Sequence, residues 1–210
     1  MMRTDEIVRA AFAERGWTLE AIPEASGYRA VFTGSKYTWE VYLSEEWDQG
    51  LFRVVVLGPL LVPRENLLRV GEFILRINAM IPVGRMDLDF DHATVRWVVS
   101  VDISVAPPSP GSIAVLVERG LMAVESMWRE LVDLAEARLD PVSAIYRLQL
   151  RQVASGDEGV EPGEITADFV ELLVTDRDPM ATVRRYREAL GPRIELRILN
   201  AADRTELYRG

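Results

Sequence analysis

The spacing of apolar residues predicts a helix followed by an antiparallel meander. Apolar residues recur at helical intervals between Thr4, a favourable N-cap, and Gly16, which is expected to end the helix. Over residues 17–57 the chain becomes rich in β-branched and aromatic residues, with stretches that alternate with polar ones. This pattern indicates three or four antiparallel strands. Gly58-Pro59 is expected to end the meander.

A second helix is predicted from Pro63 to about Ile81, ahead of Pro82, which cannot continue it. Its main apolar stripe consists of Leu67, Val70, Ile74, Ile77 and Ile81. Phe73 and Met80 widen this stripe beyond what one sheet face needs. The excess of apolar surface predicts that this helix contacts a partner.

A β-hairpin is predicted next, with strands over residues 85–90 and 95–103 and a turn through residues 91–94. The expected register pairs Phe90 with Val95. The other pairs that follow from it are Leu88 with Trp97, Met86 with Val99 and Asp89 with Arg96. The first two would face the core and the third would face water.

A long helix is predicted from about Ser112 to Leu139, after a proline-rich connector. Some of its apolar residues are spaced alternately by four and three, as in a heptad seam that packs on another helix. They are Val117, Leu121, Val124, Trp128, Leu131 and Ala135. Because further apolar residues flank the seam, this helix is also apolar on more than one side. A shorter helix is expected to follow, from Asp140-Pro141 to about Val153.

The remaining residues, 155–210, are predicted to form an acidic linker and a small β-α-β region. The linker begins in a stretch rich in glycine and acidic residues, and strands are expected over 165–174 and 193–200, with a helix between them. We therefore expect a first domain over 1–154 and a C-terminal region over 155–210. The fold class is α+β: helix, antiparallel β-meander, helix, β-hairpin and long helix, with a small α/β extension.

Composition excludes several kinds of chemistry. The 210 residues include no cysteine and one histidine, His92, so zinc fingers, iron–sulfur clusters, disulfides and cysteine nucleophiles are excluded. The chain has neither a serine nucleophile elbow nor a glycine-rich phosphate loop. We expect no enzyme activity, no cofactor and no metal site. The sequence also shows no membrane span or signal peptide, so we expect a cytoplasmic protein.

Two clusters of charged residues leave alternatives open. Asp87, Asp89 and Asp91 alternate along one predicted strand next to His92, but the spacing fails the EF-hand pattern at positions six and twelve. A regulator that uses these aspartates to respond to a metal or small molecule is one alternative. The C-terminal arginines are Arg184, Arg185, Arg187, Arg193 and Arg197. Weak nucleic-acid binding through them is the other alternative, although a net charge of -9 repels nucleic acid.

The order of elements over residues 4–139 resembles the YbjN family of bacterial proteins, whose fold is similar to that of type III secretion chaperones. The resemblance rests most on residues 67–78, 84–91 and 95–97. There a helix that ends in an apolar residue and an asparagine, Ile77-Asn78, precedes a strand that ends in an aromatic and an acidic residue, Phe90-Asp91. A hairpin then returns through a second strand that carries the core aromatic Trp97. The resemblance implies a homodimer without catalysis that binds another protein, and members of the family are described as regulators linked to stress responses.

These observations predict a chaperone-like or regulatory protein that dimerises and binds a client protein. The expected dimer or partner surface comprises Phe73, Ile77, Met80, Trp47, Leu121 and Trp128. Trp47 is included because its neighbours Glu45, Glu46 and Asp48 are acidic, which suits a basic and partly apolar client. The overall negative charge favours a basic client, such as a DNA-associated or single-stranded-DNA-binding protein, over direct contact with nucleic acid.

Overall fold

The computed structural model describes residues 4–23, 27–34, 36–154, 160–166, 169–175 and 179–210. The chain divides into two compact units, Met1–Arg129 and Glu130–Gly210. The division lies earlier than the boundary expected after residue 154. Among the described residues, no helix has the length and apolar character needed to cross a membrane.

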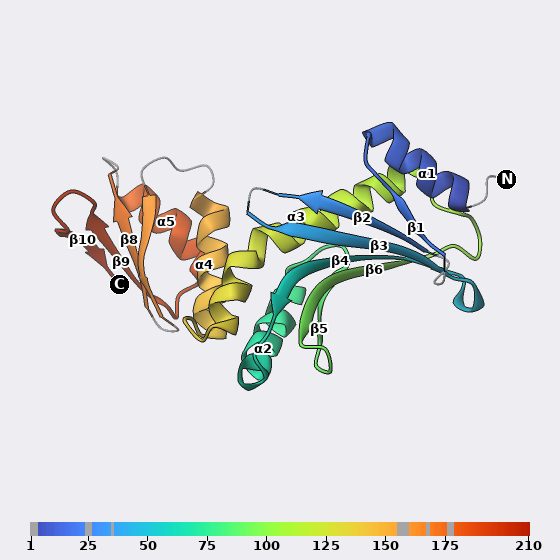
Figure 1. The fold of residues 1–210 in the computed structure, drawn as a ribbon. Coiled ribbons are helices and arrows are strands. Elements are labelled where there is room, and N and C mark those ends of the chain that lie inside the picture. The colour runs from blue at the N-terminus through green and yellow to red at the C-terminus, as the bar shows by residue number, and fades with distance from the viewer. Residues whose placement is uncertain (1–3, 24–26, 35, 155–159, 167–168, 176–178) are drawn as a thin grey trace. The chain divides into compact units, whose positions relative to one another are not determined.

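The first unit contains a six-stranded antiparallel sheet (Figure 1). Its elements are α1 (Thr4–Arg15), β1 (Glu20–Ile22), β2 (Gly27–Thr33), β3 (Thr38–Glu46), a 3-10 helix η1 (Trp47–Gln49), β4 (Leu51–Leu61), a 3-10 helix η2 (Arg64–Asn66), α2 (Leu67–Asn78), β5 (Arg85–Asp89), β6 (Thr94–Asp102) and the first part of α3 (Pro110–Ala135). The strand order is β1-β2-β3-β4-β6-β5, which places β5 at an edge. The predicted α+β class and order of elements are confirmed.

The core lies on one face of this sheet. The strand registers align Ala30, Val41, Val56, Trp97 and Met86 in a row across it, and all five are buried. α1 contributes Phe12, whose ring lies 6.5 Å from that of Phe32 on the same face. The helices thus cover the face that carries this row, as period-two alternation requires.

α3 packs directly on the sheet. A Cβ on Gly120 would lie within 3 Å of Trp97 and Val56, and one on Gly58 would overlap the ring of Trp128. The rings of Trp128 and Trp39 meet edge to face at 4.6 Å. The expectation that this part of the seam meets another helix is therefore wrong, because glycines on both elements let α3 lie against the chain's own sheet.

The bounds of three elements differ from the sequence prediction. β4 continues through Gly58-Pro59 to Leu61, with an irregular register after Leu57. α2 begins at Leu67, after η2, and ends at Asn78 rather than at Ile81. The Asn78 side chain bonds to the backbone of Met86 in β5. α3 ends at Ala135, ahead of a turn in which Ala137 has a positive φ of 56°.

The hairpin register is shifted by one residue in each strand. Asp89 pairs with Thr94, and Asp87 pairs with Arg96 in the position predicted for Asp89. The turn starts earlier because the Asp89 carboxylate accepts hydrogen bonds from the backbone N–H groups of Asp91 and His92. The two shifts together preserve the alternation, so Met86 remains on the core face.

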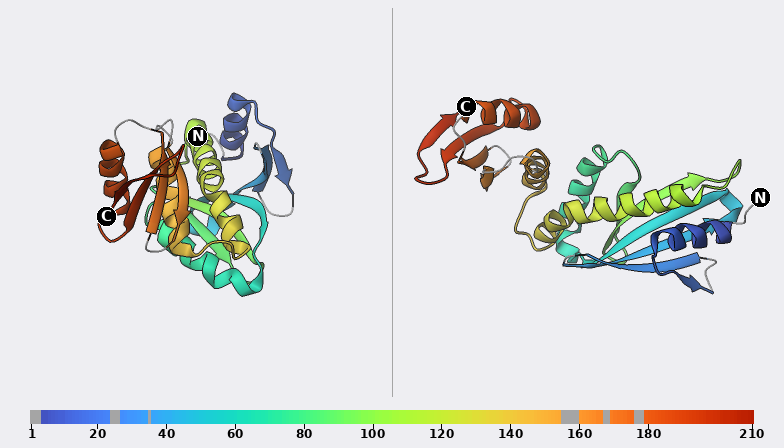
Figure 2. Two further views of the ribbon diagram at one scale, coloured as in Figure 1. Left: turned by 90° about the vertical axis from the view of Figure 1, so that its left-hand side faces the viewer. Right: turned by 90° about the horizontal axis from the view of Figure 1, so that it is seen from above.

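The sheet of the second unit, coloured orange to red in Figure 2, has four strands in the order β10-β9-β8-β7. Beyond the end of α3, its elements are α4 (Pro141–Ala154), β7 (Val160–Ile165), β8 (Phe169–Val174), α5 (Pro179–Leu190), β9 (Glu195–Asn200) and β10 (Glu206–Arg209). β8 and β9 are joined through α5, in the predicted order of strand, helix and strand. The structure pairs these two strands in parallel. β7 and β10 add a strand on each side.

The division between the units follows from contacts made by the end of α3. Glu130 forms an ion pair with Arg151 of α4, and Asp133 forms one with Arg147. The apolar core of the second unit includes Leu150 of α4, together with side chains of α5, β8 and β9. The shorter helix therefore belongs with the C-terminal region. Of the predicted linker, residues 155–159 lie outside the described residues, and residues 160–165 form β7.

Candidate functional site

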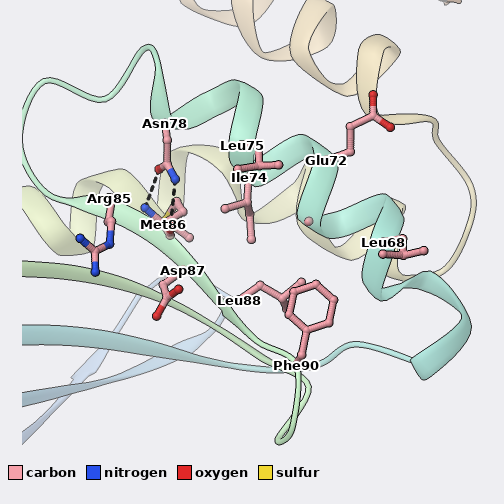
Figure 3. Close-up of a pocket in the computed structure, with 11 residues that line it drawn as sticks. Leu68, Glu72, Ile74, Leu75, Asn78, Arg85, Met86, Asp87, Leu88 and Phe90 are labelled. Atoms are coloured by element: carbon pink, nitrogen blue, oxygen red, sulfur yellow. Dashed lines mark hydrogen bonds between the residues drawn. The ribbon is translucent and has the colours of Figure 1, made fainter.

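An apolar groove lies between α2 and the edge strand β5 (Figure 3). It has a volume of about 430 Å³. The α2 side is lined by Leu68, Gly71, Glu72, Ile74, Leu75 and Asn78, and the β5 side by Arg85, Met86, Asp87, Leu88 and Phe90. Asn78 and Arg85 lie at one end of the groove, and Leu68 and Phe90 lie at the other.

Three large apolar side chains of the groove are exposed. Leu68 is 80% exposed, Leu75 is 77% exposed and Phe90 is 51% exposed. Single exposed leucines are common on protein surfaces. Here all three side chains line one hollow, and an apolar patch that lines a groove is typical of an interaction site.

The sequence of α2 explains why two leucines remain outside the core. Val70, Phe73 and Ile77 form the buried stripe that packs into the first unit. Leu68 and Leu75 are seven residues apart, so they lie on one side of the helix, two turns from each other. Gly71 lies between them and carries no side chain, so the groove stays open toward Leu88.

The free edge of β5 is occupied at one position by a side chain. Asn78 Nδ2 donates a hydrogen bond to the Met86 carbonyl at 2.9 Å, and the Met86 N–H donates to Asn78 Oδ1 at 2.8 Å. The Asn78 amide therefore takes the place that a neighbouring strand would have. Because outward-facing residues alternate along an antiparallel strand, the N–H and C=O of Leu88 also face this edge.

Charged side chains around the groove differ in how they are paired. Glu72 accepts hydrogen bonds from Arg76 at 2.6 and 2.9 Å, and Asp87 accepts them from Arg96 at 2.8 and 3.0 Å. Arg85 is exposed and has no ion-pair partner among the described residues. The groove therefore presents an apolar surface with one unpaired positive charge at its Asn78 end.

Half of the partner surface predicted from the sequence lies in the core. Phe73, Ile77 and Trp128 are buried within the chain, so the expectation that they form a partner surface is corrected by their packing. Leu121 is half-buried and Met80 is exposed next to the end of α2. The backbone of Trp47 belongs to η1, but its side chain lies outside the described residues.

The predicted aspartate cluster is engaged within its own hairpin. Asp87 pairs with Arg96, and Asp89 caps the turn and contacts His92 Nδ1 at 3.0 Å. Hydrogen bonds from the His92 backbone and side chain hold the pKa of Asp89 below its usual value. Within the described part of the chain, no three acidic or histidine side chains are grouped so as to hold a metal ion.

Arg187 and Arg197 of the C-terminal arginines contact groups of the second unit. Arg187 donates to the carbonyls of Gly191 and Ile194 beyond the end of α5. Arg197 forms ion pairs with Glu171 and with Glu206, at 3.4 and 2.8 Å. These contacts hold the second sheet together, so the basic cluster is smaller at the surface than the sequence indicated.

Sequence reasoning missed the central residues of the groove. It considered only the apolar stripe of this helix and its widening by Phe73 and Met80, and did not assign Leu68 and Leu75 to any surface. Two leucines seven residues apart, next to the polar residues Glu72 and Arg76, were the available signal. The contact between Asn78 and Met86 carries no signal of this kind, because it joins a helix end to a strand across an intervening loop.

One solved structure is similar to this chain. No protein-family model and no curated protein matches this chain. The crystal structure of YbjN from E. coli, described as a candidate transcription regulator, aligns with 66% of this chain and 95% of its own. The sequence identity is 10% and the TM-score is 0.45.

Proposed function

We propose that this chain is a non-enzymatic, regulatory or chaperone-like protein that binds an apolar segment of a client protein in the groove between α2 and β5. The observation that carries the proposal is the exposure of Leu68, Leu75 and Phe90 along one hollow. Covering these side chains would remove apolar surface from water, which is the main favourable term in most protein association.

A protein segment suits this groove because both walls are types of surface that proteins recognise. One wall is a helix face with apolar residues two turns apart, and the other is the free edge of a sheet. Grooves beside helices and exposed sheet edges are recurring sites for peptide recognition. The polar groups of the groove are few and lie at its margin.

The charge of the whole chain supports a client that is basic overall. A net charge of -9 attracts positively charged proteins over long distances and accelerates their association. DNA-associated proteins are a natural class of such clients. This long-range effect should weaken as ionic strength rises, whereas apolar contacts in the groove should not.

The test is the capture of client proteins by three forms of the full chain. The first is the wild type, the second carries Leu68→Glu and Leu75→Glu, and the third carries Met122→Glu and Val105→Glu. Met122 and Val105 are also exposed, at 69% and 93%, but they do not line the groove. The control therefore adds the same charge to apolar surface elsewhere.

The proposal expects a client that the wild type and the control retain and that the groove variant loses. The purified client should then bind the wild type in calorimetry at least about tenfold more tightly than the groove variant. Equal retention by all three forms would contradict the proposal. Sedimentation of the three forms without a client measures their oligomeric state and tests whether a second copy of the chain occupies the groove. If the wild type and the control are dimers and the groove variant is not, a second copy of the chain fills the groove.

A further inference from the structure

We infer that the client segment in this groove is extended, pairs with the backbone of Leu88 and places a carboxylate against Arg85. The inference rests on the proposed function and adds the conformation and chemistry of the segment. It follows from the free edge of β5, from the side chain that closes part of that edge and from the one unpaired charge in the groove.

The backbone of Leu88 favours an extended segment. Its N–H and C=O face the same edge as those of Met86, but only Met86 is served by the Asn78 amide. An extended segment can exchange hydrogen bonds with Leu88 while its alternate side chains enter the apolar groove. A helical segment cannot, because its backbone groups are bonded within the helix.

Asn78 sets the limit of this pairing. Because its amide already holds both outward groups of Met86, an added strand has its place at Leu88 and toward Phe90. Side chains that point to the α2 side of such a strand would meet Leu68 and Leu75. The segment should therefore carry apolar residues at alternate positions, and its chain should leave the sheet, or end, near Asn78.

Arg85 determines the charge expected at that end. Its side chain lies beyond Asn78 in Figure 3, on the strand face opposite Met86 and Leu88. Nearby carboxylates do not compensate it, since Asp87 and Asp89 are bound to Arg96 and to the hairpin turn. A guanidinium without a partner favours a carboxylate, which it can bind with two parallel hydrogen bonds. A side-chain carboxylate and a chain terminus would both provide this group.

This local preference is compatible with a client that is basic overall. Long-range attraction depends on net charge and mainly affects the rate of encounter, whereas a single close pair fixes the register of the bound segment. A basic client with one carboxylate next to an alternating apolar stretch would satisfy both.

The test uses displayed random peptides of about twelve residues, selected on the full chain in two formats, with the C-terminus free or fused. Peptides that also bind the Leu68→Glu, Leu75→Glu variant are removed. The same selection is then made on an Arg85→Glu variant, which should fold normally because Arg85 is exposed and unpaired among the described residues. Arg64→Glu is the matched control, since Arg64 is exposed but lies outside the groove.

We expect the wild-type peptides to share apolar residues two positions apart and a carboxylate at a fixed distance from them. The Arg85→Glu variant should keep the apolar pattern but select lysine or arginine in place of the carboxylate. It should bind the acidic peptides about tenfold more weakly, whereas Arg64→Glu should bind them as the wild type does. Comparison of the two display formats shows whether a side chain or a chain end supplies the carboxylate.

Two results would overturn the inference while leaving the proposed function intact. One is a set of groove-dependent peptides whose apolar residues are three and four positions apart, as in a helix. The other is an acidic preference that Arg85→Glu does not change, or no charge preference at all. If no peptide distinguishes the wild type from the Leu68→Glu, Leu75→Glu variant, and no client does so in the capture experiment, the proposed function itself fails.

Discussion

α2 and α3 have similar sequences in one respect, since both are apolar on more than one side, but the structure uses the excess differently. In α3 the heptad-like positions in the first unit, including Val117, Val124 and Trp128, pack on the chain's own sheet. In α2 the buried stripe is also filled, but Leu68 and Leu75 remain in an open groove. Apolar excess on a helix therefore indicates a partner only after the chain's own sheet has been accounted for.

The largest predicted effect tests the packing of α3 on the chain's own sheet. Trp128→Ala should lower the free energy of unfolding of the first unit by about 3–5 kcal/mol, because it removes a buried ring from contact with Trp39 and Gly58. Chemical denaturation followed by circular dichroism measures the loss. A change below about 1 kcal/mol would mean that α3 is not packed on this sheet in solution.

The second effect concerns the contact that borders the groove. Asn78→Ala should destabilise the first unit by about 1–2 kcal/mol, since the N–H and C=O of Met86 lose their partners. Asn78→Asp keeps an acceptor for the N–H but offers the carbonyl no donor, so it should recover only part of the loss. Equal stability of the wild type and Asn78→Ala would show that Asn78 does not hold the β5 edge.

For the exposed leucines of α2 in the open groove, we expect little change in stability. Leu68→Glu and Leu75→Glu should each alter the free energy of unfolding by less than about 0.5 kcal/mol, because neither side chain is buried. The same variants should abolish groove-dependent binding. Denaturation midpoints measured beside binding separate the two effects, and a large loss of stability would place these leucines in the core instead.

The smallest effect lies on the sheet face opposite the core. The hydrogen bond from Arg29 and the one from Tyr42 hold the pKa of Glu40 below its usual value. A depressed pKa in the folded state stabilises the protein above the unfolded pKa, and this contribution is lost as pH falls through the folded pKa. It should be small because both partners, Arg29 and Glu40, are about one-third exposed.

The Glu40→Gln variant isolates this contribution. Its unfolding free energy, measured from neutral to acid pH, should fall slightly less steeply than that of the wild type as Glu carboxylates protonate. A steeper fall would reverse the sign derived from the Glu40 pKa. Neither result affects the groove, because Glu40 does not line it.

The sequence predicted the order of elements in the first unit and the strand-helix-strand core of the second. It missed β7, whose Pro162-Gly163 pair is typical of a turn, because pairing with β8 overrides local propensity there. It misplaced the hairpin register because the Asp89 side chain, rather than strand alternation, sets where the turn starts. Strand β7 depends on pairing with a neighbouring strand, and the hairpin register depends on a side chain that bonds to nearby backbone. The spacing of apolar residues along the chain indicates neither contact.

The candidate site was predictable only in part. The apolar excess of the second helix pointed to the right element, but Phe73 and Ile77, which were expected at a partner surface, belong to its buried stripe. Whether an apolar side chain of α2 contacts the chain's own sheet or solvent depends on the position of β5, the edge strand next to α2. That placement is fixed by the Asn78 contact with Met86, which joins the two walls of the groove.

The most direct test of the account is amide hydrogen exchange at two residues of β5, measured by NMR with and without a client or a selected peptide. The Met86 N–H is already bonded to Asn78, so its protection should hardly change on binding. The Leu88 N–H should become strongly protected, because the bound segment covers the edge that it faces. Unchanged exchange at Leu88, with protection appearing outside α2 and β5, would show that binding takes place elsewhere and would contradict the account.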